Sequence, residues 1–153
     1  GQDVLWNGKG NDTVGGGQNA DVLHGGEGND FLLGTDPDAP GDFDFFIFDP
    51  TNGHDTIGLI QVDDQGTSDV KDDVITLTTD LEDVDTIDLS AFELNSLSDL
   101  KFTAADLDKD GADESTIITV NGGGVDWSVT VVGVLEVDPN NWSGIIELSH
   151  PGV

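Results

Sequence analysis

Residues 7–33 read NGKGNDTVG, GGQNADVLH and GGEGNDFLL when they are divided into blocks of nine, and the preceding GQDVLW has the form of an earlier block's end. Four aspartates recur at this interval: Asp3, Asp12, Asp21 and Asp30. An apolar residue stands two positions after each of them: Leu5, Val14, Leu23 and Leu32. A fixed period of this kind indicates a repeat architecture, and it decides the fold expected for this end of the chain.

Each half of the block has its own structural task. The Gly and Asn residues before each aspartate adopt positive φ at low cost, as a tight turn with inward-pointing carbonyls requires. The three residues after the aspartate are expected to form a short strand whose central apolar side chain points inward. Two blocks then complete one coil, so that turns on the same edge lie eighteen residues apart. We therefore expect Asp3 to stack on Asp21, and Asp12 on Asp30.

Stacked turns of this composition predict calcium sites. An ion between two turns would take both carboxylates and several turn carbonyls, which approaches the roughly six to eight oxygens that calcium prefers. The predicted ligands in the repeats are Asp3, Asp12, Asp21, Asp30, Gly8, Gly10, Gly16, Asn19, Gly25 and Gly28. The alternative is a glycine-rich linker, but a linker lacks the phased apolar position.

The blocks resemble the RTX (repeats in toxin) family, whose calcium-binding repeat follows G-G-x-G-x-D-x-(apolar)-x. The resemblance covers residues 1–34 and fades in GTDPDAP at 34–40, where Ala39 occupies the aspartate position and Asp36 or Asp38 could complete a last site. It implies a calcium-dependent β-roll in a type I secreted protein such as a large bacterial adhesin. The implied partners are calcium ions and the type I secretion machinery, and the implied location is extracellular or at the bacterial cell surface.

The charge balance is extreme and narrows the classes of partner. The chain carries 32 acidic residues, 26 of them Asp, against four lysines, for a formal net charge of −28. Such a surface repels nucleic acid and anionic membranes, and no apolar run is long enough to insert into a bilayer. The short Asp side chain suits turns and hard cations, although a salt-adapted surface also explains part of the charge. Cysteine is absent, which excludes disulfides and thiolate metal sites.

The rest of the chain, from residue 41 onward, is predicted to form strands. The candidate segments are 43–48, 55–60, 73–78, 84–89, 115–121, 125–134 and 144–148, with a hairpin signal at 121–124 and one helical turn at 96–100. The expected fold class is therefore all-β. A short parallel β-roll (the RTX solenoid) over residues 1–40 would be capped by an antiparallel β-rich C-terminal part over residues 41–153 that shares its core.

Two stretches of this second part, FDFFIFDPTNGHDTI and DVDTIDLSAF, resemble segments that close RTX rolls in secreted proteases and adhesins. Asp55, Asp85 and Asp88 lie in them. Turn capping and metal ligation are both open interpretations of these three aspartates.

Residues 106–114, DLDKDGADE, carry a second metal signal. Asp106, Asp108 and Asp110 alternate, Gly111 permits a sharp turn, and Glu114 falls at the ninth position, which resembles the first half of an EF-hand loop. The twelfth position is Ile117, so the bidentate glutamate of an EF-hand is missing. We expect a calcium loop between strands with these four acidic residues as ligands; an acidic solvated turn is the alternative.

No catalytic motif stands out, and we expect the chain not to be an enzyme. His24, His54 and His150 form no HExxH pair, and no G-x-S-x-G occurs. The expected function is a calcium-binding module that folds outside the cell and supports secretion and stability of a large extracellular protein. The alternatives are a sugar- or peptide-binding module of an adhesin, with Trp6, Trp127 or Trp142 as a platform rather than core, and a non-catalytic repeat module of a secreted polysaccharide-modifying enzyme.

Overall fold

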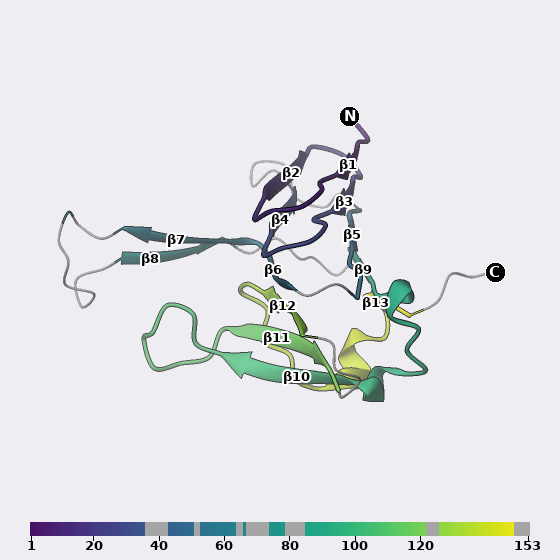
Figure 1. The fold of residues 1–153 in the computed structure, drawn as a ribbon. Coiled ribbons are helices and arrows are strands. Elements are labelled where there is room, and N and C mark those ends of the chain that lie inside the picture. The colour runs from purple at the N-terminus through teal and green to yellow at the C-terminus, as the bar shows by residue number, and fades with distance from the viewer. Residues whose placement is uncertain are drawn as a thin grey trace.

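The structure, a computed structural model, describes residues 1–35, 43–50, 53–63, 66, 74–78, 85–121 and 126–148 (Figure 1). Its strands are β1 (Val4–Trp6), β2 (Thr13–Gly17), β3 (Val22–His24), β4 (Phe31–Thr35), β5 (Phe45–Ile47), β6 (Gly53–Ile57), β7 (Leu59–Asp63), β8 (Val74–Thr78), β9 (Thr86–Asp88), β10 (Leu100–Ala105), β11 (Ser115–Val120), β12 (Trp127–Val131) and β13 (Ile146–Glu147). The helices of this described part are three short 3-10 turns: η2 (Ser90–Phe92), η3 (Leu97–Asp99) and η4 (Pro139–Trp142).

The strands form two main sheets between which the first part of the chain alternates. One sheet has the order β1-β3-β5-β9-β13, and every neighbouring pair in it is parallel. The other has the order β10-β11-β12-β6-β4-β2; it is parallel from β2 to β12 and antiparallel from β12 to β10. The antiparallel pair β7 and β8 projects away from both sheets (Figure 1).

Two ladders of apolar side chains fill the space between the sheets. In the first sheet, register aligns Leu5, Leu23, Phe46, Ile87 and Ile146, and all but Leu5 are buried. In the second sheet, the matching ladder is Val14, Leu32, Ile57 and Val131, all buried. The apolar position of every repeat thus faces the core, as its phase predicts, because successive side chains of a strand point to opposite faces of the sheet.

The predicted fold class, an all-β parallel roll with an antiparallel cap, is wrong. β9 pairs in parallel with β5, β12 with β6, and β13 with β9, so these strands of the predicted C-terminal part extend both sheets rather than close an end. The result is one all-parallel sheet and one mixed sheet. All-parallel sheets are typical of α/β proteins, where helices connect the strands; here the connections run through turns and through the opposite sheet.

The predicted positions of the strands agree with the structure better than the predicted fold class does. Strands lie within all seven predicted segments, although 55–60 is divided between β6 and β7, and η3 occupies the predicted turn at 96–100. β10 was not expected, because LKFTAA has neither clear alternation nor a continuous apolar run. The boundary at 40/41, the aspartates Asp36 and Asp38, and the turn at 122–124 lie outside the described residues.

Glycines in the repeats make room for the aspartates. A Cβ added to Gly25 would lie 2.5 Å from Oδ2 of Asp30, and one added to Gly16 would lie 2.6 Å from Oδ2 of Asp21. Gly34 is packed against the Asp44 carboxylate in the same way. At Gly16, Gly25 and Gly34, glycine is therefore required by close packing and not by its backbone angles.

We predict that Gly25→Ala lowers the free energy of unfolding by about 1–3 kcal/mol, because the new methyl group overpacks the Asp30 carboxylate. Gly15→Ala is the matched control, since a Cβ there meets no atom within 4 Å, and it should change stability by less than about 0.5 kcal/mol. Urea unfolding at a fixed calcium concentration measures both. Equal effects of the two substitutions would contradict the packing role of Gly25.

Candidate metal centre

Hydrogen bonds join the aspartates of successive coils into two rows. In the first row, the backbone N–H of Asp3 donates to Oδ1 of Asp21 at 2.7 Å, that of Asp21 to Asp44 at 2.9 Å, and that of Asp44 to Asp85 at 3.0 Å. Each carboxylate therefore accepts from the aspartate of the neighbouring strand. The stacking of Asp3 on Asp21 follows the eighteen-residue spacing of the sequence.

The second row runs along the other sheet. The N–H of Asp12 donates to Oδ1 of Asp30 at 2.8 Å, and that of Asp30 donates to Oδ1 of Asp55 at 3.0 Å. Asp44, Asp55 and Asp85 were not predicted as members of these rows. The signal was present, since each is followed two residues later by a core residue: Phe46, Ile57 and Ile87.

Most of the aspartates in these rows are buried, and burying their negative charge costs free energy. Asp21 and Asp30 are each only 1 % exposed, and Oδ2 of each is buried without a hydrogen-bond partner among the described residues. Neither forms an ion pair with any part of the chain that the structure describes. A buried carboxylate without a counter-charge is costly, so the position of these two oxygens favours a nearby cation.

The predicted carbonyl ligands line the turns beside these rows. The carbonyl oxygen of Gly8 accepts from Glu27 N at 2.8 Å, and the N–H of Gly10 donates to Glu27 O at 2.8 Å. A Cβ added to Gly28 would lie 1.7 Å from the carbonyl oxygen of Gly10, and one added to Gly53 would lie 2.2 Å from that of Gly28, while Asn19 has a φ of 80°. Each carbonyl keeps a second lone pair that a cation can share.

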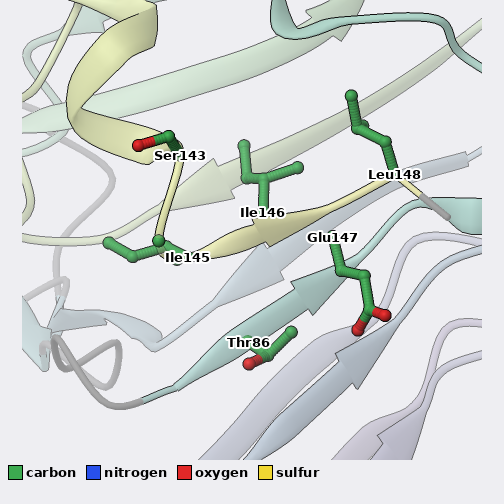
Figure 2. Close-up of a pocket in the computed structure, with 7 residues that line it drawn as sticks. Thr86, Ser143, Ile145, Ile146, Glu147 and Leu148 are labelled. Atoms are coloured by element: carbon green, nitrogen blue, oxygen red, sulfur yellow. The ribbon is translucent and has the colours of Figure 1, made fainter. Parts of the chain in front are cut away.

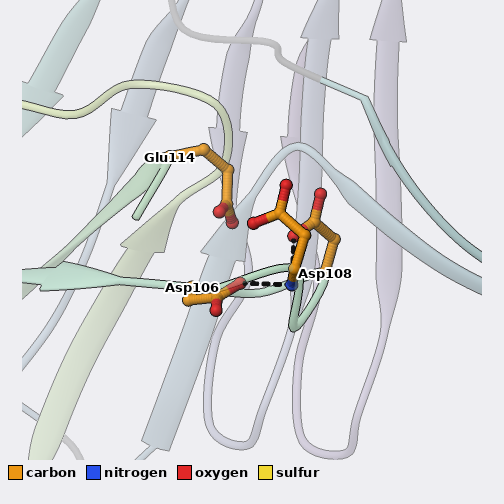
Figure 3. A group of neighbouring side chains, drawn as sticks. Asp106, Asp108 and Glu114 are labelled. Atoms are coloured by element: carbon orange, nitrogen blue, oxygen red, sulfur yellow. Dashed lines mark hydrogen bonds between the residues drawn. The ribbon is translucent and has the colours of Figure 1, made fainter. Parts of the chain in front are cut away.

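The loop at 106–114 draws four acidic side chains together. One oxygen from each of Asp106, Asp108, Asp110 and Glu114 lies within 4.8 Å of the others, and among the described residues this is the one such group of three or more potential ligands. Figure 3 shows Asp106, Asp108 and Glu114 converging from the loop between β10 and β11. The rows formed by the repeat aspartates do not make a cluster of this kind.

The backbone of the loop fixes this arrangement. Asp106 accepts from Gly111 N at 2.8 Å, and Glu114 Oε1 accepts from Leu107 N at 2.6 Å. Lys109 and Gly111 have positive φ, 62° and 95°, which lets the chain reverse within the loop. Glu114 N donates to Ala105 O at 3.1 Å and closes the β10–β11 hairpin, so the loop is anchored at its base.

The local environment separates the pKa values of two neighbouring carboxyls. Partial burial acts to raise the pKa of Asp106, but hydrogen bonds from the Gly111 and Lys109 backbone outweigh it and lower that pKa. Partial burial raises the pKa of Asp108, and repulsion from Asp110 and Glu114 adds to it. Oε2 of Glu114 is buried without a hydrogen-bond partner in the described part of the chain, so it adds an unused ligand oxygen.

His54 on β6, Ser128 on β12 and Asp126 just before β12 are the residue types of a Ser-His-Asp hydrolase. His54 Nδ1 lies 2.8 Å from Ser128 Oγ, and its Nε2 lies 3.4 Å from Asp126 Oδ1. Ser128 is only 9 % exposed and Asp126 is largely exposed, so the hydroxyl is poorly placed to meet a substrate. A structural hydrogen bond between parallel strands explains the contact. His150 lies outside the described residues.

An open hollow of about 410 Å³ lies beside β13, with Thr86 and Glu147 among its lining (Figure 2). Ile146 and Leu148 point to one side of the strand and Glu147 to the other. A single carboxylate among aliphatic side chains offers no set of metal ligands or catalytic groups. In the described residues, no helix has the length and apolar character needed to cross a membrane.

No protein-family model, curated protein or solved structure gives a significant match to this chain.

Asp55, which ends the second row, provides a pH test of that row. Burial raises its pKa from 3.8 to about 6, and the negative charge of Asp30 acts in the same direction, although the Asp30 N–H bond opposes them. Without a bound cation, the stability linked to this carboxyl is fully present below pH 3.8 and is lost as the pH rises through about 6. The difference between the two limits is about 3 kcal/mol.

We predict that Asp55→Asn removes this part of the pH dependence, because asparagine cannot ionise. The measurement is urea unfolding between pH 4 and pH 7.5 in chelator, with an osmolyte present to keep the chain folded. Asp113→Asn, an exposed change in the 106–114 loop, should retain the wild-type slope. A wild type that gains stability relative to Asp55→Asn as the pH rises would contradict the prediction.

Proposed function

We propose that this chain is a non-catalytic calcium-binding module whose folding depends on calcium, and that it belongs to a secreted or cell-surface bacterial protein. The observation that carries the proposal is the convergence of Asp106, Asp108, Asp110 and Glu114, with one oxygen of each within 4.8 Å of the others. These ligands are all oxygens, and no imidazole or thiolate belongs to the group. Hard oxygen donors favour calcium or magnesium over the softer transition metals.

Calcium fits this loop better than magnesium does. Magnesium demands near-ideal octahedral geometry and usually retains several waters, whereas calcium accepts irregular sets of carboxylates and carbonyls. The loop supplies three alternating aspartates and a glutamate held at its base by Leu107 N. Asp106, Asp108, Asp110 and Glu114 would hold the ion, which would offset their mutual repulsion and tie the two ends of the loop together.

The aspartate rows support the dependence of folding on calcium. Folding buries Asp21 and Asp30 with one oxygen of each lacking a partner in the described structure, and the whole chain carries a net charge of −28. Cations near the turns would offset both the buried charge and the general repulsion. A cation that binds only the folded chain stabilises it by mass action, so higher calcium favours folding.

The likeness of residues 1–34 to RTX repeats supports the cellular setting that we propose. In a cytoplasm poor in calcium, the glycine-rich turns and clustered aspartates would leave the chain unfolded, which suits export by the type I secretion machinery. Outside the cell, abundant calcium would drive folding and stabilise the parent protein, such as a large adhesin. A non-catalytic repeat module of a secreted polysaccharide-modifying enzyme would use the same switch.

We predict that chelation of calcium abolishes the β-type circular dichroism spectrum and the cooperative melting transition, and that added calcium restores both. Sodium chloride at high ionic strength is the control, because it screens the charge of −28 without filling specific sites. An unchanged spectrum and melting point in chelator would refute calcium-dependent folding. Full refolding by sodium chloride alone would show that screening, and not site binding, is sufficient.

A second prediction concerns the loop. Asp108→Asn should remove one calcium ion from the stoichiometry measured by isothermal titration calorimetry, or weaken that step at least tenfold, because the side chain loses its charge. Asp113→Asn is the matched control: it lies in the same loop, is exposed and is not part of the cluster. Identical isotherms for the two variants would contradict a calcium site at Asp108.

A further inference from the structure

Glu114 connects the acidic loop to the sheet, because it is the last acidic residue of the loop and directly precedes β11. Figure 3 shows its side chain pointing toward Asp106 and Asp108. Its Oε2 atom is buried and has no hydrogen-bond partner among the described residues, whereas Oε1 accepts from the N–H of Leu107 at 2.6 Å. A buried carboxylate oxygen without a donor favours a cation beside it. The position of this side chain should therefore depend on whether the loop holds an ion.

The residue after Glu114 carries this dependence into the sheet. Ser115 begins β11 and is 0 % exposed. Its Oγ donates to Oε1 of Glu114 at 3.4 Å and accepts from the backbone N–H of Gly133 at 2.9 Å. A hydroxyl group has one proton to donate, so the bond to Glu114 leaves a lone pair free to accept from Gly133. The carboxylate that faces the loop is thus joined to a residue just beyond β12.

Thr116 makes a second connection to the same part of the chain. This side chain is also 0 % exposed, and its Oγ1 donates to the carbonyl oxygen of Val134 at 2.6 Å and accepts from the N–H of Glu136 at 2.9 Å. The carbonyl oxygen of Glu136 in turn accepts from the indole N–H of Trp142 at 3.0 Å. Water does not reach such buried groups, so losing one of these partners leaves a polar group unsatisfied.

Residues 133–142, named here the 133–142 segment, depend on these bonds for their position. Residues 134–138 form neither strand nor helix, so the bonds to Ser115 and Thr116 take the place of a strand ladder. The segment ends at Trp142, which is 1 % exposed and stacks on Phe102 of β10 with ring centroids 5.6 Å apart. Its position therefore decides whether this part of the core is closed.

We infer that calcium binding to the 106–114 loop controls how tightly the 133–142 segment is held against the sheet. The inference rests on the proposed calcium site in that loop. In an empty loop, four carboxylates within 4.8 Å of one another repel, and displacement of Glu114 removes the acceptor of Ser115. In a filled loop, Glu114 stays in place and the bonds to the segment persist. The aspartates of the two rows take no part in these bonds, so the control is separate from the repeats.

The first test is hydrogen exchange followed by NMR, at a calcium concentration that calorimetry shows to fill the repeats but not the altered loop. Asp108→Asn should raise the exchange rates of the Gly133 and Glu136 amides at least about fivefold, which is the lower range of coupling between linked sites. The amides of β3 and β4 should retain their wild-type rates. Asp113→Asn, an exposed change outside the cluster, is the matched control and should preserve the protection of both amides.

The second test uses the reciprocity of coupled sites: whatever loosens the segment must also weaken calcium binding. Thr116→Val removes the hydroxyl and should weaken the loop's calcium affinity at least about fivefold in isothermal titration calorimetry, although Thr116 is not in the group of ligands. Thr119→Val makes the same change in the same strand, at a side chain with no hydrogen bond in the described structure, and should leave the affinity unchanged. Circular dichroism in calcium confirms folding, and Ser115→Ala serves if Thr116→Val does not fold.

The possible failures are distinguishable. If Asp108→Asn neither removes nor weakens any calcium-binding step, the loop is not a calcium site, and the proposed site and the inference fail together. If that step is lost while Gly133 and Glu136 exchange as in wild type, the calcium site stands and the control of the segment is overturned. Equal calcium affinity of the folded Thr116→Val and Thr119→Val variants would overturn it as well.

Discussion

The hydrogen bond from the backbone of one aspartate to the carboxylate of the aspartate stacked on it is the constraint on which this structure depends. It recurs from Asp3 to Asp85 along one sheet and from Asp12 to Asp55 along the other. It sets the register of neighbouring strands, because shifting a strand by one residue would break the bond and turn the adjacent apolar side chain away from the core. Glycines such as Gly25 are needed because the carboxylate lies where a Cβ would be.

The same stacking buries negatively charged carboxylates, and this buried charge is the reason for the proposed binding of cations. A hydrogen bond to a carboxylate offsets part of the cost of burying its charge, but one oxygen of Asp21 and one of Asp30 are left without a donor in the described structure. Cations beside the turns would offset the remainder. The loop at 106–114 presents the same chemistry on the surface, where four carboxylates meet without burial of the whole group. One ion class can therefore serve both places.

The nine-residue repeat shows which features of the fold can be predicted from the local sequence pattern. The phase of Asp and apolar residues predicted which side chains enter the core and which aspartates stack, because side chains alternate between the two faces of a strand. It missed Asp44, Asp55 and Asp85, since longer connections replace the nine-residue spacing there while the Asp-x-apolar signature persists. The exposure of Trp6 could not be predicted from the sequence either, because an aromatic residue in a strand packs in the core as readily as on the surface.

The composition of the turns, the inward residues of the repeats and the acidic loop can be derived from the amino-acid sequence, since each is encoded within a few neighbouring positions. Which strands pair, and in which direction, follows from the packing of the folded chain. β12 joins β6, and β13 joins β9, through contacts between residues far apart in the chain. Pairing direction depends on how whole segments pack on the shared core, and a strand's alternation is the same whether its neighbour runs parallel or antiparallel.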